Sequence, residues 1–230
     1  LGRRREAEIL LEQSRGLAQT LGDEQERALA DNYQGLIKQM DGDYTAAVRL
    51  YQAGLQRCRQ VNDRVGMARA CNNLGVIYLR LGNYADSAHY LQAALDLRRQ
   101  LENPKSIADS LNNLGILQHE LGDYAREAQL LSEALGYFRQ VGDRKGIGTI
   151  LHNLGGVHLA LEQYTEARQF LEEALLLRQA DPVGLANTIN NLGTVALRAG
   201  DFASAATRFA EAIQFALDSH DTSITLDILV

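Results

Sequence analysis

A unit of about 40 residues recurs along the chain, and this repeat constrains the fold more than any other feature. The motif Asn-Asn-Leu-Gly begins at Asn72, Asn112 and Asn190, and His152 begins the variant His-Asn-Leu-Gly. A weaker copy begins at Asn32. The glycines of these motifs are 40 residues apart, except for the last interval of 38. Repeats with periods of roughly 20–50 residues build arrays in which each unit packs on its neighbours, so we expect an array.

Each repeat is predicted to form two helices joined by a tight turn. In the second repeat Leu74, Ile77 and Leu81 lie on one face of a helix. Gly82 follows where a helix ends in the left-handed conformation, and Asn83 can cap the next helix. The pairs Gly122-Asp123 and Gly200-Asp201 repeat this arrangement. Glu162 replaces the glycine in one repeat, so we expect that turn to be built differently.

The same pattern sets the expected organisation of residues 1–230 as one array. The expected helical hairpins are 24–62, 64–102, 104–141, 144–179 and 182–218. Residues 3–21 match the second helix of a preceding repeat, and residues 221–230 match the start of a further helix. The first residue is Leu1 rather than Met. We therefore expect the chain to be part of a longer protein.

The motif resembles the tetratricopeptide repeat family over essentially the whole chain. Leu74-Gly75, Tyr84, Leu91 and Ala94 occupy the family's positions, and three later repeats match in register. The first copy departs from the family because Gln34 replaces its leucine. The 40-residue form is most similar to repeats of kinesin light chain, of the spindle-orientation Leu-Gly-Asn proteins and of bacterial regulators. The resemblance implies an all-α, right-handed superhelical solenoid of antiparallel hairpins that binds other proteins.

Composition and charge disfavour other classes of function. The net charge is −6, which argues against nucleic acid and against an anionic membrane surface. No apolar run approaches the roughly 20 residues that span a bilayer. Cys58 and Cys71 provide neither a disulfide framework nor a metal site, and no catalytic motif occurs. We expect no enzyme, no cofactor and no metal, and a cytoplasmic location.

Two columns of amides are the candidate partner-binding residues. The resemblance places the first helix of each repeat on the concave side and assigns peptide contacts to the asparagine two residues before the motif glycine. These residues are Asn73, Asn113, Asn153 and Asn191. The neighbouring column, three residues before the glycine, contains Asn72, Asn112, His152 and Asn190. Arg69 and Arg80 are candidate partners for acidic groups. An amide both donates and accepts, as a peptide bond does, but these amides could equally bond between adjacent helices.

Three hypotheses of function follow from these features. The first is a protein-interaction module that binds a peptide or a helical segment of a partner in its concave groove. The second is a regulatory arm of a larger signalling or transcription-regulator protein that binds a domain of its own chain. The third is self-assembly as a homo-oligomer through the terminal helices, where Ile9-Leu10-Leu11 and Ile224 to Val230 form apolar stripes.

Overall fold

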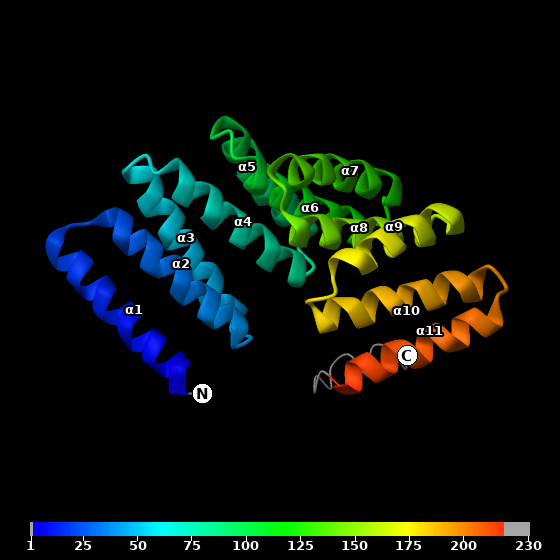
Figure 1. Cartoon of the computed structure of the whole chain (residues 1–230). Coiled ribbons are helices and arrows are strands. Elements are labelled where there is room, and N and C mark those ends of the chain that lie inside the picture. The colour runs from blue at the N-terminus through cyan, green and yellow to red at the C-terminus, as the bar shows by residue number, and fades with distance from the viewer. Residues whose placement is uncertain (1, 219–230) are drawn as a thin grey trace. The chain divides into compact units, whose positions relative to one another are not determined.

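The computed structural model describes the backbone of residues 2–218, and within that range the only regular elements are α-helices (Figure 1). The helices are α1 (Gly2–Leu21), α2 (Glu24–Met40), α3 (Tyr44–Gln60), α4 (Arg64–Arg80), α5 (Tyr84–Gln100), α6 (Pro104–Glu120), α7 (Tyr124–Val141), α8 (Arg144–Ala160), α9 (Tyr164–Leu177), α10 (Pro182–Arg198) and α11 (Phe202–Asp218). The all-α prediction is confirmed. The helix expected at 221–230 lies outside the described residues.

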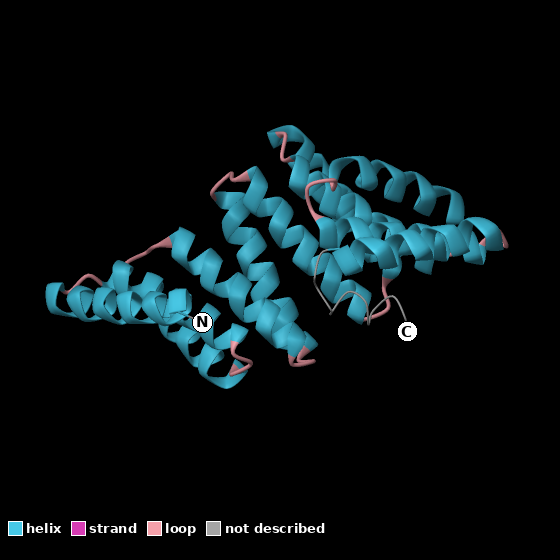
Figure 2. Ribbon diagram, turned by 60° about the horizontal axis from the view of Figure 1, so that its bottom comes forward, coloured by secondary structure: helices cyan, strands magenta, loops and turns pink. Residues whose placement is uncertain are grey.

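The chain forms two compact units that divide after Leu117, within α6. In the first unit α2 packs on α3 and α4 packs on α5, while α1 covers α2 and α3 contacts α4. In the second unit α8 packs on α9 and α10 packs on α11, with α7 against α8 and α9 against α10. Short loops join the antiparallel helices (Figure 2). Each unit is therefore a stack of helical hairpins.

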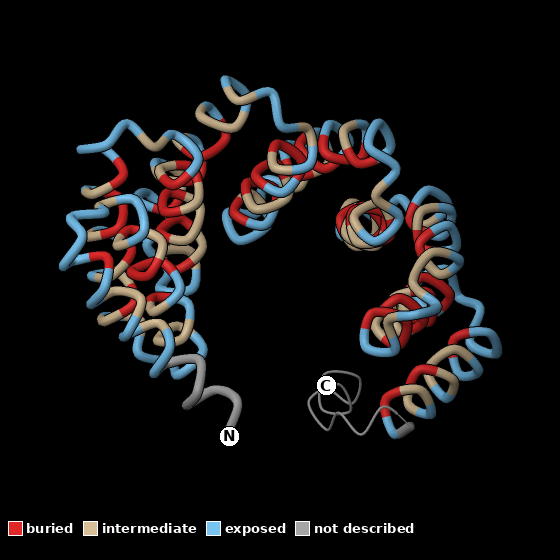
Figure 3. Tube along the Cα trace, turned by 60° about the vertical axis from the view of Figure 1, so that its left-hand side comes forward, coloured by how far each residue is buried: buried red, intermediate tan, exposed pale blue. Residues whose placement is uncertain are grey.

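In four of the hairpins, α2–α3, α4–α5, α8–α9 and α10–α11, a glycine of the first helix lies directly against a large side chain of the second helix. A β-carbon added at Gly75 would lie 2.5 Å from Leu91 Cγ, and one at Gly155 would lie 2.4 Å from Leu171 Cγ. Both leucines are fully buried, and buried positions recur in stripes along the helices (Figure 3). The motif glycine therefore sets how closely the two helices cross, because any side chain there would force them apart.

The turns between the helices follow the predicted chemistry. Gly82, Gly122 and Gly200 adopt left-handed φ angles of 71°, 76° and 82°. The next residue caps the following helix, as Asp123 does by accepting a bond from the Arg126 amide at 3.0 Å. The expectation for Glu162 was wrong, because Glu162 takes the same left-handed conformation, with φ 60°. Its turn keeps the shared bond from the residue after it, Gln163 N to His158 O at 2.8 Å.

We predict that restoring the common turn in this repeat stabilises the protein. A side chain in the left-handed region is strained by about 1 kcal/mol, and Gln163 forms no side-chain cap. The double variant Glu162→Gly, Gln163→Asp should raise the free energy of unfolding by about 1–2 kcal/mol. Urea unfolding measures the change. The reverse change, Gly82→Glu, should lower stability, and equal stabilities for all three proteins would contradict the prediction.

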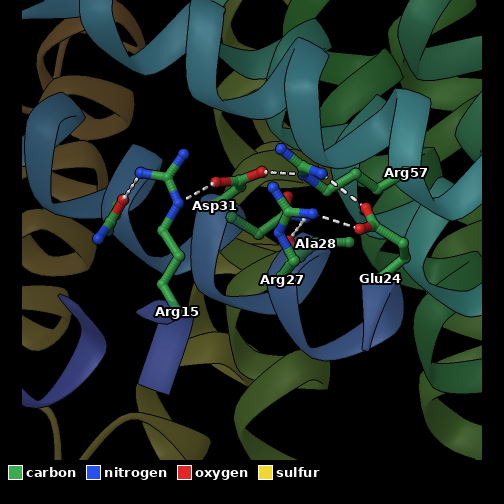
Figure 4. A network of polar contacts seen from close by, with 8 residues as sticks. Arg15, Glu24, Arg27, Ala28, Asp31 and Arg57 are labelled. Atoms are coloured by element: carbon green, nitrogen blue, oxygen red, sulfur yellow. Dashed lines mark hydrogen bonds and ion pairs between the residues drawn. The ribbon is translucent and has the colours of Figure 1, made fainter. Parts of the chain in front are cut away.

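The first repeat replaces part of its apolar interior with a network of charges (Figure 4). Asp31 is 0% exposed and lies between Arg57, whose Nε is 2.9 Å from Oδ2, and Arg15, whose Nε is 3.2 Å from Oδ1. Arg57 also bonds Glu24 at 2.6 Å, and this bond lowers the pKa of Glu24. Gln34, which departs from the family pattern, accepts a bond from Arg15 at 3.2 Å. The network thus joins α1, α2 and α3.

We predict that breaking this network on one side is strongly destabilising. The variant Asp31→Ala leaves Arg57 without its buried partner and should lower the free energy of unfolding by about 3–5 kcal/mol. The triple variant Asp31→Leu, Gln34→Leu, Arg57→Leu introduces the leucines that stand at equivalent positions of later repeats. It should recover most of the loss, because apolar replacement of a buried ion pair is often neutral. Thermal unfolding measures the stability of both variants, and a triple variant no more stable than Asp31→Ala would contradict the prediction.

Candidate partner-binding face

The predicted site residues all lie on the first helices of the hairpins. Arg69, Asn72, Asn73 and Arg80 lie on α4, and Asn112 and Asn113 lie on α6 within the first unit. The second unit carries His152 and Asn153 on α8, and Asn190 and Asn191 on α10. All of these residues are partly exposed except Arg80, which is exposed. The columns are therefore accessible, but their members differ in the contacts they make.

Two amides of the first unit bond to each other between repeats. Asn113 Nδ2 donates to Asn72 Oδ1 at 2.9 Å. Arg98, on α5 of the same hairpin as Asn72, donates to the same oxygen at 3.2 Å. Arg98 also donates to the Ser110 hydroxyl at 2.7 Å and to the Ser106 carbonyl at 3.0 Å. These bonds hold α4 and α6 together, so Asn72 and Asn113 have a structural role of the kind that the sequence left open.

Two amides of the column that lies two residues before the motif glycine form no hydrogen bond. Within the described part of the chain, the side chains of Asn73 and Asn191 form no hydrogen bond, and both are partly exposed. Asn112 and Asn153, in contrast, each take part in a polar interaction. An unengaged amide on a helix surface can donate and accept at once. Asn73 in one unit and Asn191 in the other therefore each keep a donor and an acceptor available.

His152 takes the place of a column asparagine and is held in one tautomer. Its Nδ1 is 3.0 Å from Thr188 Oγ1, and the Thr188 hydroxyl donates to the Gly184 carbonyl at 2.7 Å. Because that hydroxyl proton is directed to Gly184, Nδ1 of His152 must be the donor, which leaves Nε2 as an acceptor. Burial, followed by the nearby charge of Arg178, lowers the pKa of His152 to about 4. The ring is therefore neutral at pH 7.

A cavity of about 410 Å³ opens in the first unit between α2, the end of α3 and α4. It lies beside Asn32, which belongs to the column three residues before the motif glycine. Its walls include Asn32, Cys58, Asp63 and Arg69. The sequence analysis identified Arg69 but missed the role of the other three. Comparing residues 58, 98, 138 and 178, which are Cys, Arg, Phe and Arg at one position of the repeat, could have indicated an altered site.

The described residues show no cluster of three metal-ligating side chains. In the same part of the chain, each helix is too short or too polar to cross a membrane. The candidate site residues are thus amides and a few charged groups, together with a polar cavity in the first unit.

A comparison of the sequence with protein-family models agrees with the helical-hairpin fold. The tetratricopeptide repeat model matches residues 26–100, 66–140 and 146–218. The chain belongs to the tetratricopeptide repeat family. No curated protein matches it in sequence.

Several solved structures share this tetratricopeptide repeat fold. BtubC from P. vanneervenii superposes with a TM-score of 0.82 at 22% identity, covering 95% of this chain and 92% of that one. Kinesin light chain TPR-like repeats from Podosopora anserina give a TM-score of 0.70 at 13% identity, covering 85% and 98%. The Rap conjugation gene regulator of plasmid pLS20, in complex with the Phr* peptide, gives 0.73 at 19% identity, covering 92% of this chain and 59% of the regulator. The expected resemblance to kinesin light chain and bacterial regulators is confirmed for the fold.

We predict that His152 makes the stability of this tetratricopeptide repeat protein depend on pH. The unfolded chain binds a proton near pH 6.5, whereas the folded chain excludes it until about pH 4. The stabilisation is present above pH 6.5 and is lost as the pH falls towards 4, by about 3 kcal/mol in total. Urea unfolding at several pH values measures this slope. His152→Asn should flatten it, whereas replacing the exposed His89 by Asn should not; equal slopes for the two variants would contradict the assignment.

Proposed function

We propose that this chain is a protein-interaction module in which the first helices of a unit bind an extended peptide segment. The unengaged amides of Asn73 and Asn191 carry the proposal. Each offers one donor and one acceptor, which matches the N–H and C=O groups of a peptide bond. Bonds of this kind hold the main chain and leave the identity of the side chains to other contacts.

The column around these amides supports a peptide partner. Arg69 lies one helical turn before Asn73 on α4, and Arg80 lies at the end of the same helix. These two cations can pair with acidic groups of a bound segment, while the chain's net charge of −6 disfavours nucleic acid. A bound peptide is also what the similar Rap regulator contains in its complex with Phr*.

The partner segment can belong to another protein or to the same polypeptide. Either source presents the same main-chain groups to Asn73 and Asn191. The regulatory-arm hypothesis is therefore a variant of the peptide-binding proposal, distinguished by whether a free peptide competes. Self-assembly rests on a different surface, the exposed Ile9, Leu10 and Leu17 of α1.

The first experiment selects binders from a displayed library of random peptides and measures their affinity by fluorescence anisotropy. The variant Asn73→Ala, Asn191→Ala should weaken a selected peptide by about tenfold or more, because the donor and the acceptor of the amide that binds it are both lost. The matched control is Gln56→Ala, Gln169→Ala, which removes two exposed amides from the second helices α3 and α9. This control should bind as the parent does.

Methylation of the peptide's own backbone gives an independent test. If Asn73 and Asn191 bond the main chain, N-methylation at the contacting residues should weaken binding as much as the protein variant does. No further loss should occur when the two changes are combined. Equal affinity of the parent, the variant and the control for every selected peptide would sink the proposal.

A further inference from the structure

The cavity beside Asn32 is lined by one buried acceptor without a donor and by a partly exposed carboxylate oxygen that has only a weak donor. Asn32 is 4% exposed, and its Nδ2 donates to the Ala28 carbonyl at 2.9 Å. Its Oδ1 is buried and has no hydrogen-bond partner. Asp63 uses Oδ1 to cap the Gly66 amide at 2.9 Å, while its Oδ2 has only the Cys58 thiol at 3.8 Å. Leaving such a group unsatisfied is unfavourable, so the cavity is suited to a ligand that donates several bonds.

The next repeat shows what satisfies these acceptors. Shifting the cavity by one 40-residue period places Arg98 where Cys58 stands and Asn72 where Asn32 stands. The Arg98 guanidinium donates to Asn72 Oδ1 at 3.2 Å and to the Ser106 carbonyl at 3.0 Å. Ser106 is the counterpart of Gly66, which lines the open cavity. The protein's own guanidinium thus occupies the equivalent space one repeat later.

At the junction between α9 and α10, an arginine likewise donates to the aspartate that caps the next helix. Arg178 is the counterpart of Cys58, and Asp181 is the counterpart of Asp63. Asp181 caps the Gly184 amide through Oδ1 at 3.1 Å, and its Oδ2 accepts a bond from Arg178 at 3.2 Å. Two repeats therefore place an arginine against acceptors that are open beside Cys58.

Cys58 cannot replace this arginine. Its side chain is short, and burial raises the pKa of the thiol to about 11, so it is uncharged at pH 7. The space that remains is about 410 Å³, within the range of roughly 300–1,000 Å³ typical of ligand sites. Three carboxylates, Asp23, Glu26 and Asp63, line it against one cation, Arg69. The walls therefore favour a cationic donor.

We propose that this cavity binds the guanidinium of an arginine side chain supplied by a partner, in place of the arginine that other repeats supply themselves. The proposal rests on the peptide-binding function and adds that the first unit prefers a partner segment containing an arginine. A guanidinium has five N–H donors in a planar fork, which suits a cavity lined by the acceptor-bearing residues Asn32, Gly66 and Asp63. An ammonium group is a compact point charge without that fork, so lysine should bind less well.

The test uses the whole chain and a small probe, N-acetyl-arginine amide, followed by ¹⁵N NMR. Saturable shifts are expected for the Gly66 amide and the Asn32 side-chain amide. N-acetyl-lysine amide and N-acetyl-citrulline amide, which keep the length but change the head group, should bind at least about tenfold more weakly. Free arginine forms a separate arm. Tighter binding of free arginine than of the blocked form would support the guanidinium site but assign it to the amino acid itself.

Cys58→Arg should close the site by placing the protein's own guanidinium in it. We expect this variant to lose the probe-induced shifts and to have a higher melting temperature, as the bonds of Arg98 would be reproduced. The matched control, Gln56→Arg, adds the same charge at an exposed position of α3 and should keep binding. The reciprocal variant, Arg98→Cys, should open a second site near Ser106. If Arg98→Cys fails to fold, Cys58→Arg and its control still decide the question.

The outcomes separate this proposal from the peptide-binding function. The probe does not need the two column amides, so Asn73→Ala, Asn191→Ala should still bind N-acetyl-arginine amide even if it loses peptides. An absence of saturable shifts in the parent chain would overturn the cavity proposal, and so would equal binding of the citrulline probe or retained binding by Cys58→Arg. None of these results would contradict main-chain binding by Asn73 and Asn191.

Discussion

The close crossing of two helices at a glycine is the contact on which the rest of the structure depends. At Gly75 and Gly155 a β-carbon would come within 3 Å of a fully buried leucine, so only glycine lets the helices meet at this distance. The crossing fixes the rotation of the first helix. It therefore also fixes which positions, two and three residues before the glycine, remain at the edge of the packed hairpin. The columns that carry Asn73 and Asn191 follow from that contact rather than from any local preference of asparagine.

With the backbone fixed in this way, one position of the second helix changes the chemistry between hairpins. Arg98 ties Asn72 to Ser110, whereas Phe138 lies against Gly146, where a β-carbon would be 2.4 Å from its ring. Cys58 is small and leaves the cavity. The side chain at this one position therefore decides whether the junction contains polar hydrogen bonds, as at Arg98, an apolar contact, as at Phe138, or a cavity, as at Cys58. In four of the hairpins the glycine crossing holds the two helices together independently of this position.

The sequence predicted the features that arise within one helix or one turn, and it did not specify which polar side chains pair between helices. The helices, the left-handed glycines and the caps depend on neighbours within a few residues, so the motif reveals them. The Glu162 turn was misjudged because the bonds around it outweigh the strain of one left-handed residue. The bond between Asn113 and Asn72 joins residues 41 apart, and the pairing of Asp31 with Arg57 joins residues 26 apart. Such pairs depend on side-chain rotamers on separate helices, which a single sequence does not specify.

The absence of a hydrogen bond between Asn73 and Asn32 connects the peptide-binding proposal with the arginine-site proposal. Asn113 donates to Asn72, and the same relation one repeat earlier would have Asn73 donate to Asn32. That bond does not form: Asn32 Oδ1 has no partner, and the Asn73 side chain makes no hydrogen bond within the described residues. Where Arg98 is present, it donates to the oxygen that Asn113 also reaches, and the amide pair is locked. Where Cys58 replaces it, Asn32 Oδ1 and the Asn73 side chain are both left without a hydrogen bond in the same unit. A segment whose main chain lies along Asn73 and whose arginine enters the cavity would supply both sets of bonds at once, so binding there would complete the contact that the next repeat makes internally.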